Sequence, residues 1–433
     1  MYRNALEDLK KWKQKDNRKP LILQGARQVG KTWLMQEFGK LEFQNTLYIN
    51  FEKSNKIYSV FEHDLDPNRI LGNLQIIMGQ TITPDTLIIF DEVQNCPRAL
   101  TSLKYFCEDL PKQPVVAAGS LLGLALHKGT SFPVGKVDFL HIYPLTFLEF
   151  IRALGQEHLY NFLLKCNFDS IPVFKHKCET LLKQYCYVGG MPEAVNEFAS
   201  SKDFQKVRDI HFNLLNTYEQ DFSKYVPNTM ANRIYEVWHS IHTQLAKENK
   251  KFLYGAIREG ARAREYEQAI EWLQDSGLIY KLYHISKPNM PLSMYQDRNA
   301  FKIFMVDIGL LGALSELDAK TLLEGNSLLT EFKGAITEQY VLQHLKANPH
   351  LPVYYWTSKA QAEVDFVIQH DNKIIPIEAK AATNLRAKSL KTYCDLYHPE
   401  TAVRLSMADY KRTGNLYDIP LYMAELLPQI IKE

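Results

Sequence analysis

The chain has 433 residues, which is too long for a single hydrophobic core and predicts about two to four domains. Hydrophobic residues make up 46% and charged residues 23%, as is usual for a soluble globular protein. The net charge of +2 excludes a uniformly basic chain, so any basic surface must be local.

Three features bear on the cellular compartment. The six cysteines are scattered and none form a Cys-x-x-Cys pair, so neither a zinc site nor a redox pair is indicated. Residues 1–19 contain no signal-peptide core, and the longest apolar window, Val115 to Leu126, is too short to span a membrane. We therefore expect a cytoplasmic protein with reduced thiols and no membrane partner.

The first elements lead to a phosphate-binding motif. A helix is expected over residues 4–13, and a short buried strand over residues 20–24. The segment that follows matches the pattern G-x-x-x-x-G-K-[S/T], and a helix is expected to start at Thr32. The predicted nucleotide-binding residues are Gly25, Ala26, Arg27, Gln28, Val29, Gly30, Lys31 and Thr32.

The chemistry of a triphosphate explains this pattern. Many N–H donors must approach the phosphates at once, which the two glycines of the loop permit, and the helix presents its positive N-terminal end. We expect Lys31 to bridge the β- and γ-phosphates and the Thr32 hydroxyl to bind Mg²⁺. The guanine-reading motif N-K-x-D is absent, so the predicted cofactors are ATP and Mg²⁺.

Further strands predict a parallel sheet with helices on both faces. They are expected over residues 45–51, 86–92, 114–120 and 141–143, with helices over residues 71–78 and 100–110 between them.

Polar residues close two of these strands. Asp91 and Glu92 end an apolar run and should face the ligand at the carboxyl edge of the sheet. We predict that Asp91 holds Mg²⁺ and that Glu92 polarises the attacking water. Ser120 ends the next strand and is a candidate sensor of the γ-phosphate, with an ordinary turn-forming serine as the alternative.

The phosphate loop, the strand LIIFDEVQ and the strand AAGSLLG resemble those of an AAA-type ATPase. More narrowly, the chain resembles an uncharacterised prokaryotic family of such ATPases, and residues 143–150 and 188–194 match the family's pattern. The resemblance covers nearly the whole chain. It implies a C-terminal domain of unknown function related to restriction-endonuclease folds. Lys136 departs from the arginine usual in the family, which puts an arginine-specific role there in doubt.

Helical periodicity dominates after residue 146 and resembles the lid that follows the sheet in AAA proteins. The Gly-Gly-Met-Pro turn at residues 189–192 is either a hinge or nucleotide-facing turn, or an ordinary helix connection. Residues 228–317 then have the order helix, turn, helix and strand, typical of a winged helix. A local net charge of +3 over residues 247–265 favours DNA contact, while packing between domains is the alternative.

The last segment has chemistry of its own. A helix over residues 334–345 carries Glu338, and a predicted hairpin carries Asp365, Glu378 and Lys380. This arrangement resembles a PD-(D/E)xK nuclease core. Glu378 and Lys380 share one face of a strand because strand side chains alternate. We predict that Glu338, Asp365 and Glu378 bind Mg²⁺ and that Lys380 is catalytic. A retained but inactive fold is the alternative.

The predicted fold is therefore an α/β P-loop ATPase followed by a helical lid, a winged helix and a nuclease-like α/β domain. Its predicted parts are residues 1–145, 146–226, 227–329 and 330–433. Two functions are carried forward: an ATPase that couples nucleotide state to a DNA-binding or nuclease-like domain, and a nucleotide-dependent switch or scaffold with an inactive nuclease fold. DNA and a homo-oligomer are the candidate partners, and Arg98 is an available arginine finger.

Overall fold

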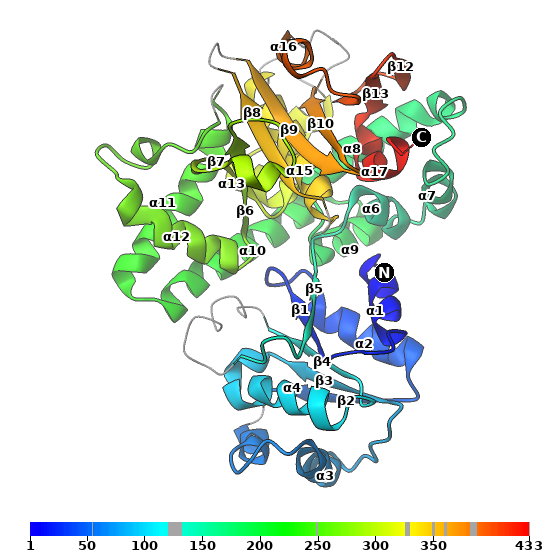
Figure 1. The fold of residues 1–433 in the computed structure, drawn as a ribbon, viewed down its shortest axis with the longest axis vertical. Helices are drawn as coiled ribbons and strands as arrows, with labels where there is room; N and C mark the ends of the chain where they lie inside the picture. The colour runs from blue at the N-terminus through cyan, green and yellow to red at the C-terminus, as the bar shows by residue number, and fades with distance from the viewer. Residues whose placement is uncertain are drawn as a thin grey trace. The chain divides into compact units, whose positions relative to one another are not determined.

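The computed structural model describes residues 1–53, 55–119, 132–247, 250–324, 330–348, 351–358, 362–381 and 388–432. Two compact units divide the chain, and each is described by itself (Figure 1). The first comprises Met1–Tyr143 with Asp275–Leu278, and the second comprises Pro144–Gln274 with Ile279–Glu433.

The first unit contains a five-stranded parallel sheet in the order β2-β3-β4-β1-β5. Its strands are β1 (Leu21–Gln24), β2 (Asn45–Asn50), β3 (Thr86–Asp91), β4 (Val115–Ala118) and β5 (Asp138–His141). Its helices are α1 (Ala5–Lys13), α2 (Lys31–Glu42), α3 (Pro67–Met78) and α4 (Pro97–Asp109), with 3-10 turns η1 (Asn55–Phe61) and η2 (Val93–Asn95). This confirms the predicted parallel α/β sheet, although β5 begins earlier than the strand expected over residues 141–143.

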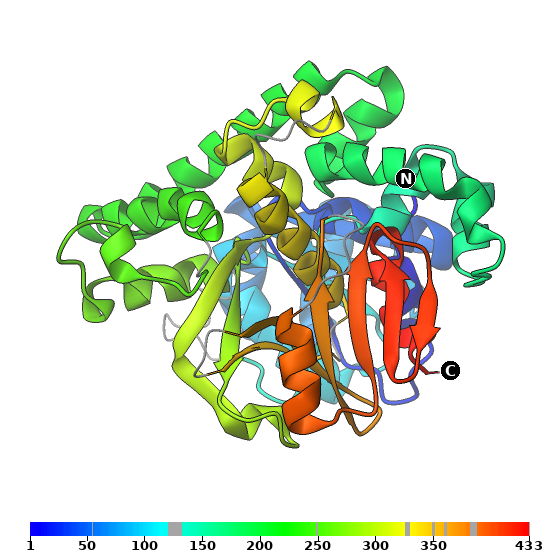
Figure 2. The same ribbon diagram turned by 90° about the horizontal axis from the view of Figure 1, so that it is seen from above.

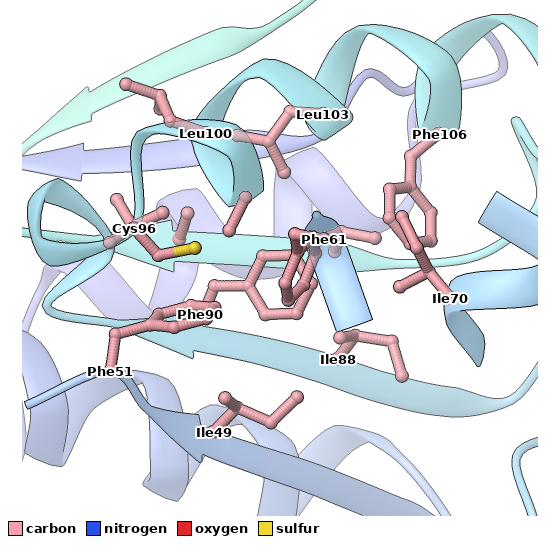
Figure 3. Packing of buried hydrophobic residues seen from close by; sticks show 14 of the residues in the cluster. Ile49, Phe51, Phe61, Ile70, Ile88, Phe90, Cys96, Leu100, Leu103 and Phe106 are labelled. Carbon is pink, nitrogen blue, oxygen red and sulfur yellow. The ribbon is translucent and has the colours of Figure 1, made fainter. Parts of the chain in front are cut away.

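An aromatic core covers one face of this sheet (Figure 3). Phe90 of β3 packs edge-to-face against Phe51, Phe61 and Phe106, with ring centroids 5.6 to 6.2 Å apart. Ile88, two residues before Phe90, points into the same cluster because strand side chains alternate. This core fixes β3 and therefore the position of the acidic residues that follow it.

The second unit begins with helices, as predicted for residues 146–226. They are α6 (Phe147–Ala153), α7 (Glu157–Leu163), η3 (Ile171–Phe174), α8 (Lys175–Val188), α9 (Pro192–Ser201), α10 (Phe204–Tyr225), α11 (Asn228–Leu245), η4 (Tyr254–Ala256) and α12 (Ala263–Asp275). Nowhere in the described part of the chain is a helix both long enough and apolar enough to cross a membrane.

An eight-stranded mixed sheet completes this unit, in the order β12-β13-β11-β10-β9-β8-β6-β7 (Figure 2). Its strands are β6 (Ile279–Ile285), β7 (Gln296–Met305), β8 (Val353–Thr357), β9 (Glu363–His370), β10 (Lys373–Ala379), β11 (Ala402–Ser406), β12 (Lys411–Thr413) and β13 (Leu416–Pro420). The remaining helices are η5 (Leu292–Tyr295), α13 (Ile308–Leu314), α14 (Ala319–Glu324), α15 (Thr330–Lys346), α16 (Lys388–Tyr397), η7 (Leu421–Leu426) and α17 (Leu427–Ile430).

The pairing of β6 with β8 bears on the predicted domain boundary between residues 329 and 330. β6 lies parallel to β8, with Tyr283 opposite Tyr354, so the strand expected in a separate winged-helix domain belongs to the C-terminal sheet. The predicted boundary at residues 329 and 330 therefore falls inside one compact unit. The assignments of 146–226 as a lid, 227–329 as a winged helix and 330–433 as nuclease-like remain predictions.

The hairpin β9–β10 forms at the expected place. Asp371 and Asn372 connect the strands with φ of 46° and 60°, the left-handed conformation that a two-residue type I′ turn requires. The turn sets the register that pairs Ile377 with Phe366. One step further along both strands, Asp365 and Glu378 become neighbours.

The Gly-Gly turn after α8 is held inside the second unit. Gly190 N–H donates to the buried Asp307 carboxylate at 2.6 Å, and Gly190 O accepts from Leu145 N–H at 2.7 Å. A Cβ atom on Gly190 would lie 2.1 Å from Leu145 O, and one on Gly189 would lie 2.2 Å from Asp307 Oδ1. Close packing against the Leu145 backbone thus explains Gly190, and the Asp307 carboxylate together with a φ of 70° explains Gly189.

We expect Gly190→Ala to destabilise the second unit by about 1–3 kcal/mol, because the added methyl group must displace backbone atoms. The measurement is thermal unfolding followed by circular dichroism. Gly255→Ala is the matched control, since nothing lies within 4 Å of its Cβ position. Equal melting temperatures for the two variants would contradict this account of the turn.

Two carboxyl groups meet at the start of α6. Glu149 closes a capping box with Thr146, and Glu425 Oε2 accepts from Leu148 N–H at 3.1 Å. Burial, followed by the nearby Glu149 carboxylate, raises the pKa of Glu425 from 4.5 to about 8. The folded state therefore binds a proton that the unfolded state releases above pH 4.5.

Stability should accordingly fall as the pH rises from about 5 to about 8, by up to about 1.4 kcal/mol per pH unit from this group. Glu425→Gln should flatten that slope and raise the melting temperature at pH 8. Glu271→Gln, on the exposed side of α12, is the control. A wild-type slope that persists unchanged in Glu425→Gln would show that another group is responsible.

Candidate functional site

The predicted phosphate loop lies between β1 and α2, as expected from the sequence. Gly30, immediately before α2, has a φ of 90°, and Gly25 has a φ of 137°. A Cβ atom on Gly25 would lie 2.2 Å from Ile142 O. Both glycines are therefore required by the backbone path, which leaves the N–H groups at the start of α2 available to an anion.

The Lys31 side chain lies inside this loop and is 7% exposed. Its ammonium group donates to Gly25 O at 2.8 Å and to Ala26 O at 2.7 Å. Burial lowers the pKa of Lys31 to about 8, although the carboxylates of Glu92 and Asp91 act in the opposite direction. A polyanionic ligand would favour the charged form of this lysine.

Asp91 ends β3 and contacts the first turn of α2. Its Oδ2 accepts from Thr32 Oγ1 and from the hydroxyl of Tyr48, each at 2.8 Å. Burial raises the pKa of Asp91, and it raises that of Tyr48 to about 12. A hydroxyl and a carboxylate are hard oxygen ligands, so this pair fits Mg²⁺. Sequence reasoning missed Tyr48, which β2 places beside β3.

Glu92 has a strained backbone, with a φ of 52°. Its Oε2 accepts from Gln94 Nε2 at 2.5 Å. This conformation turns the chain after β3. Gln94, which the sequence did not single out, therefore orients the predicted catalytic carboxylate.

Three other residues of this unit were singled out in the sequence: Ser120, Arg98 and Lys136. Ser120 lies outside the described residues. Arg98 donates to Phe61 O, and the partly exposed Lys136 forms an ion pair with Glu108 at 2.9 Å. The role of Arg98 as an arginine finger remains a prediction.

The second unit brings the four predicted C-terminal residues together. Asp365 Oδ2 accepts from Ala379 N–H at 2.8 Å, beside Glu378, and Lys380 Nζ lies 2.6 Å from Glu378 Oε1. Glu338 of α15 acts on Asp365, Glu378 and Lys380 electrostatically. The alternation of β10 thus produces the expected Glu-x-Lys arrangement.

Two further lysines and one further carboxylate, that of Glu363, complete what we call the C-terminal ion cluster. Its members are Lys250, Lys302, Glu338, Glu363, Asp365, Glu378 and Lys380. Lys302 of β7 is fully buried, pairs with Glu363 and lies 3.5 Å from Glu338 Oε2. Lys250 pairs with Glu338 Oε1. The only sequence signal for Lys302 was a lysine inside the apolar run of residues 300–306.

Burial and the neighbouring charges of the cluster explain the directions in which its pKa values are shifted. Burial by itself would lower the pKa of Lys302, but Glu338, Glu363 and Asp365 outweigh it and raise that pKa. Burial would raise the pKa of Glu338, and Lys302 and Lys250 lower it instead. Burial, then Glu338 and Glu378, holds the pKa of Asp365 well above its ordinary value. Lys302 and Glu338 are therefore a charged pair.

This cluster does not fit the predicted Mg²⁺ site. Across the described ranges, no three His, Cys, Asp or Glu side chains are grouped so as to hold a metal ion. Glu338 faces an ammonium group at each of its oxygens. Glu338 Oε2 and Glu378 Oε2 are both buried without a hydrogen-bond partner. Lys302 lies 3.5 Å from the first, and Lys380 lies 2.6 Å from the other oxygen of Glu378, so these two oxygens beside ammonium groups are a poor site for a divalent cation.

The predicted DNA-contacting segment has less free positive charge than its composition suggested. Within residues 247–265, Lys250 pairs with Glu338, which lies outside the segment, and the pair of Arg258 with Glu265 at 3.3 Å is already counted in the net charge of +3. On α12, Tyr266, Ile270 and Leu273 are buried. DNA contact through this segment remains a prediction.

Comparison with protein-family models divides the chain into three matches. Residues 17–151 match an AAA domain, residues 179–321 match a domain of unknown function (DUF8612), and residues 333–423 match another (DUF4143). The first match agrees with the loop and the sheet described above. Neither of the other descriptions names a winged helix or a nuclease.

Comparison with individual proteins adds relatives without a described activity. The uncharacterized proteins Rv2008c of Mycobacterium tuberculosis and Mb2031c of Mycobacterium bovis are each 25% identical over 373 residues, covering 83% of this chain and 70% of theirs. The Walker-type ATPase PABY2304 of Pyrococcus abyssi is 15% identical, with 72% of this chain and 95% of that chain covered and a TM-score of 0.45. AMPPCP-bound DnaA from Aquifex aeolicus is 14% identical, with 63% of this chain and 88% of that chain covered and a TM-score of 0.29.

The AAA-domain match and the geometry of the loop show that the chain contains an AAA-type P-loop ATPase domain.

Proposed function

We propose that this chain hydrolyses ATP in a Mg²⁺-dependent reaction at the phosphate loop. The observation that carries the proposal is the contact between Thr32 Oγ1 and Asp91 Oδ2, with Glu92 as the next residue. It brings the first turn of α2 and the end of β3 together at one edge of the parallel sheet. That edge is where open α/β sheets bind their ligands.

Each residue then has a distinct role. N–H groups of the loop and of the α2 N-terminus bind the phosphate oxygens, and Lys31 exchanges its loop carbonyls for the β- and γ-phosphates. Glu92 orients the attacking water and accepts its proton, while Gln94 holds the Glu92 carboxylate in place. Mg²⁺ held by Thr32 and Asp91 would neutralise charge on the phosphates.

We further propose that the nucleotide state acts on the second unit as a switch. Arg3 is buried and donates to Val29 O in the phosphate loop at 2.9 Å and to Tyr143 O at 2.6 Å. Tyr143 is the last residue before the chain enters the second unit at Pro144. Ile142 N–H also donates to Gln24 O at 2.7 Å. A movement of the loop would therefore reach the connecting segment through bonded contacts.

Of the two predicted roles for the second unit, we favour the switch or scaffold over metal-dependent cleavage. The support is the pairing of Lys250, Lys302 and Lys380 with the carboxylates of the C-terminal ion cluster. A homo-oligomer and DNA stay as candidate partners.

For the ATPase site, Glu92→Gln should lower kcat by about 10²- to 10⁴-fold and leave ATP affinity nearly unchanged, because only the proton-accepting carboxylate is lost. Lys31→Ala should instead weaken ATP binding. Phosphate release and a fluorescent ATP analogue measure the two effects, and Glu62→Gln, an exposed change in the same unit, is the control. Unchanged nucleotide affinity in Lys31→Ala would show that the site is wrongly placed.

For the switch, hydrogen exchange over residues 144–274 should differ between the ATP-bound and nucleotide-free protein. Arg3→Lys should reduce this difference while ATP binding persists, because a single ammonium group replaces the two-pronged contact. Arg18→Lys is the matched control, since Arg18 also bonds two carbonyls, Lys13 O and Lys112 O, outside the loop. An unaltered response in Arg3→Lys would refute this route.

A further inference from the structure

The C-terminal ion cluster has a cation of its own at its centre. Lys302 enters from β7, is fully buried and pairs with carboxylates from two other elements, Glu338 of α15 and Glu363 of β9. The centroid of the Tyr355 ring lies 4.9 Å from the ammonium group. Such a position, surrounded by oxygens and an aromatic face, is one that a bound cation would occupy.

Charge balance explains why a cation is needed there. Four carboxylates gathered beside β9 and β10 would strongly repel one another in a medium of low polarity. Lys250, Lys302 and Lys380 leave the seven-residue cluster with a formal charge of −1. A divalent ion added to this set would meet three ammonium groups at close range, and both oxygens of Glu338 would have to leave their lysines.

We propose that Lys302 acts as a permanent internal cation that replaces a divalent metal ion in this cluster, so that the cluster is a metal-free ionic lock joining β7 to α15 and β9. Lys250 extends the lock from the segment before η4, where Phe252 N–H donates to Phe301 O of β7 at 2.8 Å. The lock thereby ties the residues predicted as a winged helix to the residues predicted as a nuclease. This proposal does not depend on ATP hydrolysis.

The wild-type protein provides the first test. Mn²⁺ alone, without nucleotide, is titrated into wild type and Glu378→Gln and followed by electron paramagnetic resonance. We expect the two titrations to coincide, because no Mn²⁺ binds through Glu378. A Mn²⁺ site present in wild type and lost in Glu378→Gln would overturn the proposal. So would plasmid nicking with Mn²⁺ that is lost in Asp365→Ala.

The second test concerns the lock itself. Lys302→Met should lower the melting temperature of the full chain by several degrees, since the buried Glu338 and the partly exposed Glu363 each lose a counter-charge. Lys281→Met is the matched control, because Lys281 lies on the paired strand β6, is partly exposed and contacts the rings of Tyr283 and Phe301. Equal melting temperatures for the two variants would overturn the proposal. If Lys302→Met does not fold while Lys281→Met does, the lock is supported, and the Mn²⁺ titration of wild type still decides the metal.

Discussion

The position of β1 between β4 and β5 is the constraint on which the nucleotide site depends. Main-chain bonds to both neighbours hold Leu23 opposite Ala118 and Leu140, so the chain leaves β1 in a fixed direction at Gln24. The phosphate loop can then turn only where glycine permits it. β4 also pairs with β3 and places Asp91 opposite Ala118. Thr32, in the first turn of α2, meets Asp91 because the parallel strands β1 and β3 end on the same side of the sheet.

The buried charged side chains of the two units have different kinds of partners. In the first, Lys31 and Asp91 are buried with partners that a ligand can replace, namely loop carbonyls and hydroxyl groups. In the second, the carboxylates of Glu338, Glu363 and Glu378 face ammonium groups of the same chain. The pair between Lys302 and Glu338 is costly to break because both groups are buried, and either one alone would be an uncompensated charge. The buried charges of the first unit have partners that a ligand can replace, whereas those of the second unit are paired within the chain.

Local sequence patterns predicted features that depend on a few consecutive residues. The phosphate loop, the acidic end of β3 and the Asp371–Asn372 turn are each set by backbone preferences within one short segment. The shared face of Glu378 and Lys380 follows from strand alternation alone. Bounds were less well predicted: α3 begins at Pro67, before the expected start at residue 71, because Asp66 caps it and Pro67 favours the first helical position.

The sequence by itself determined the chemistry of the phosphate loop, the parallel sheet around it and the four polar residues of the C-terminal hairpin and helix. Only the tertiary structure decided that β6 pairs with β8, that Arg3 joins the loop to Tyr143 and that Lys302 lies among the carboxylates. The reason is physical. Alternation and turn preference act between near neighbours, whereas the partner of a strand or of a buried charge is chosen by packing over 61 positions between Lys302 and Glu363, and 140 between Arg3 and Tyr143.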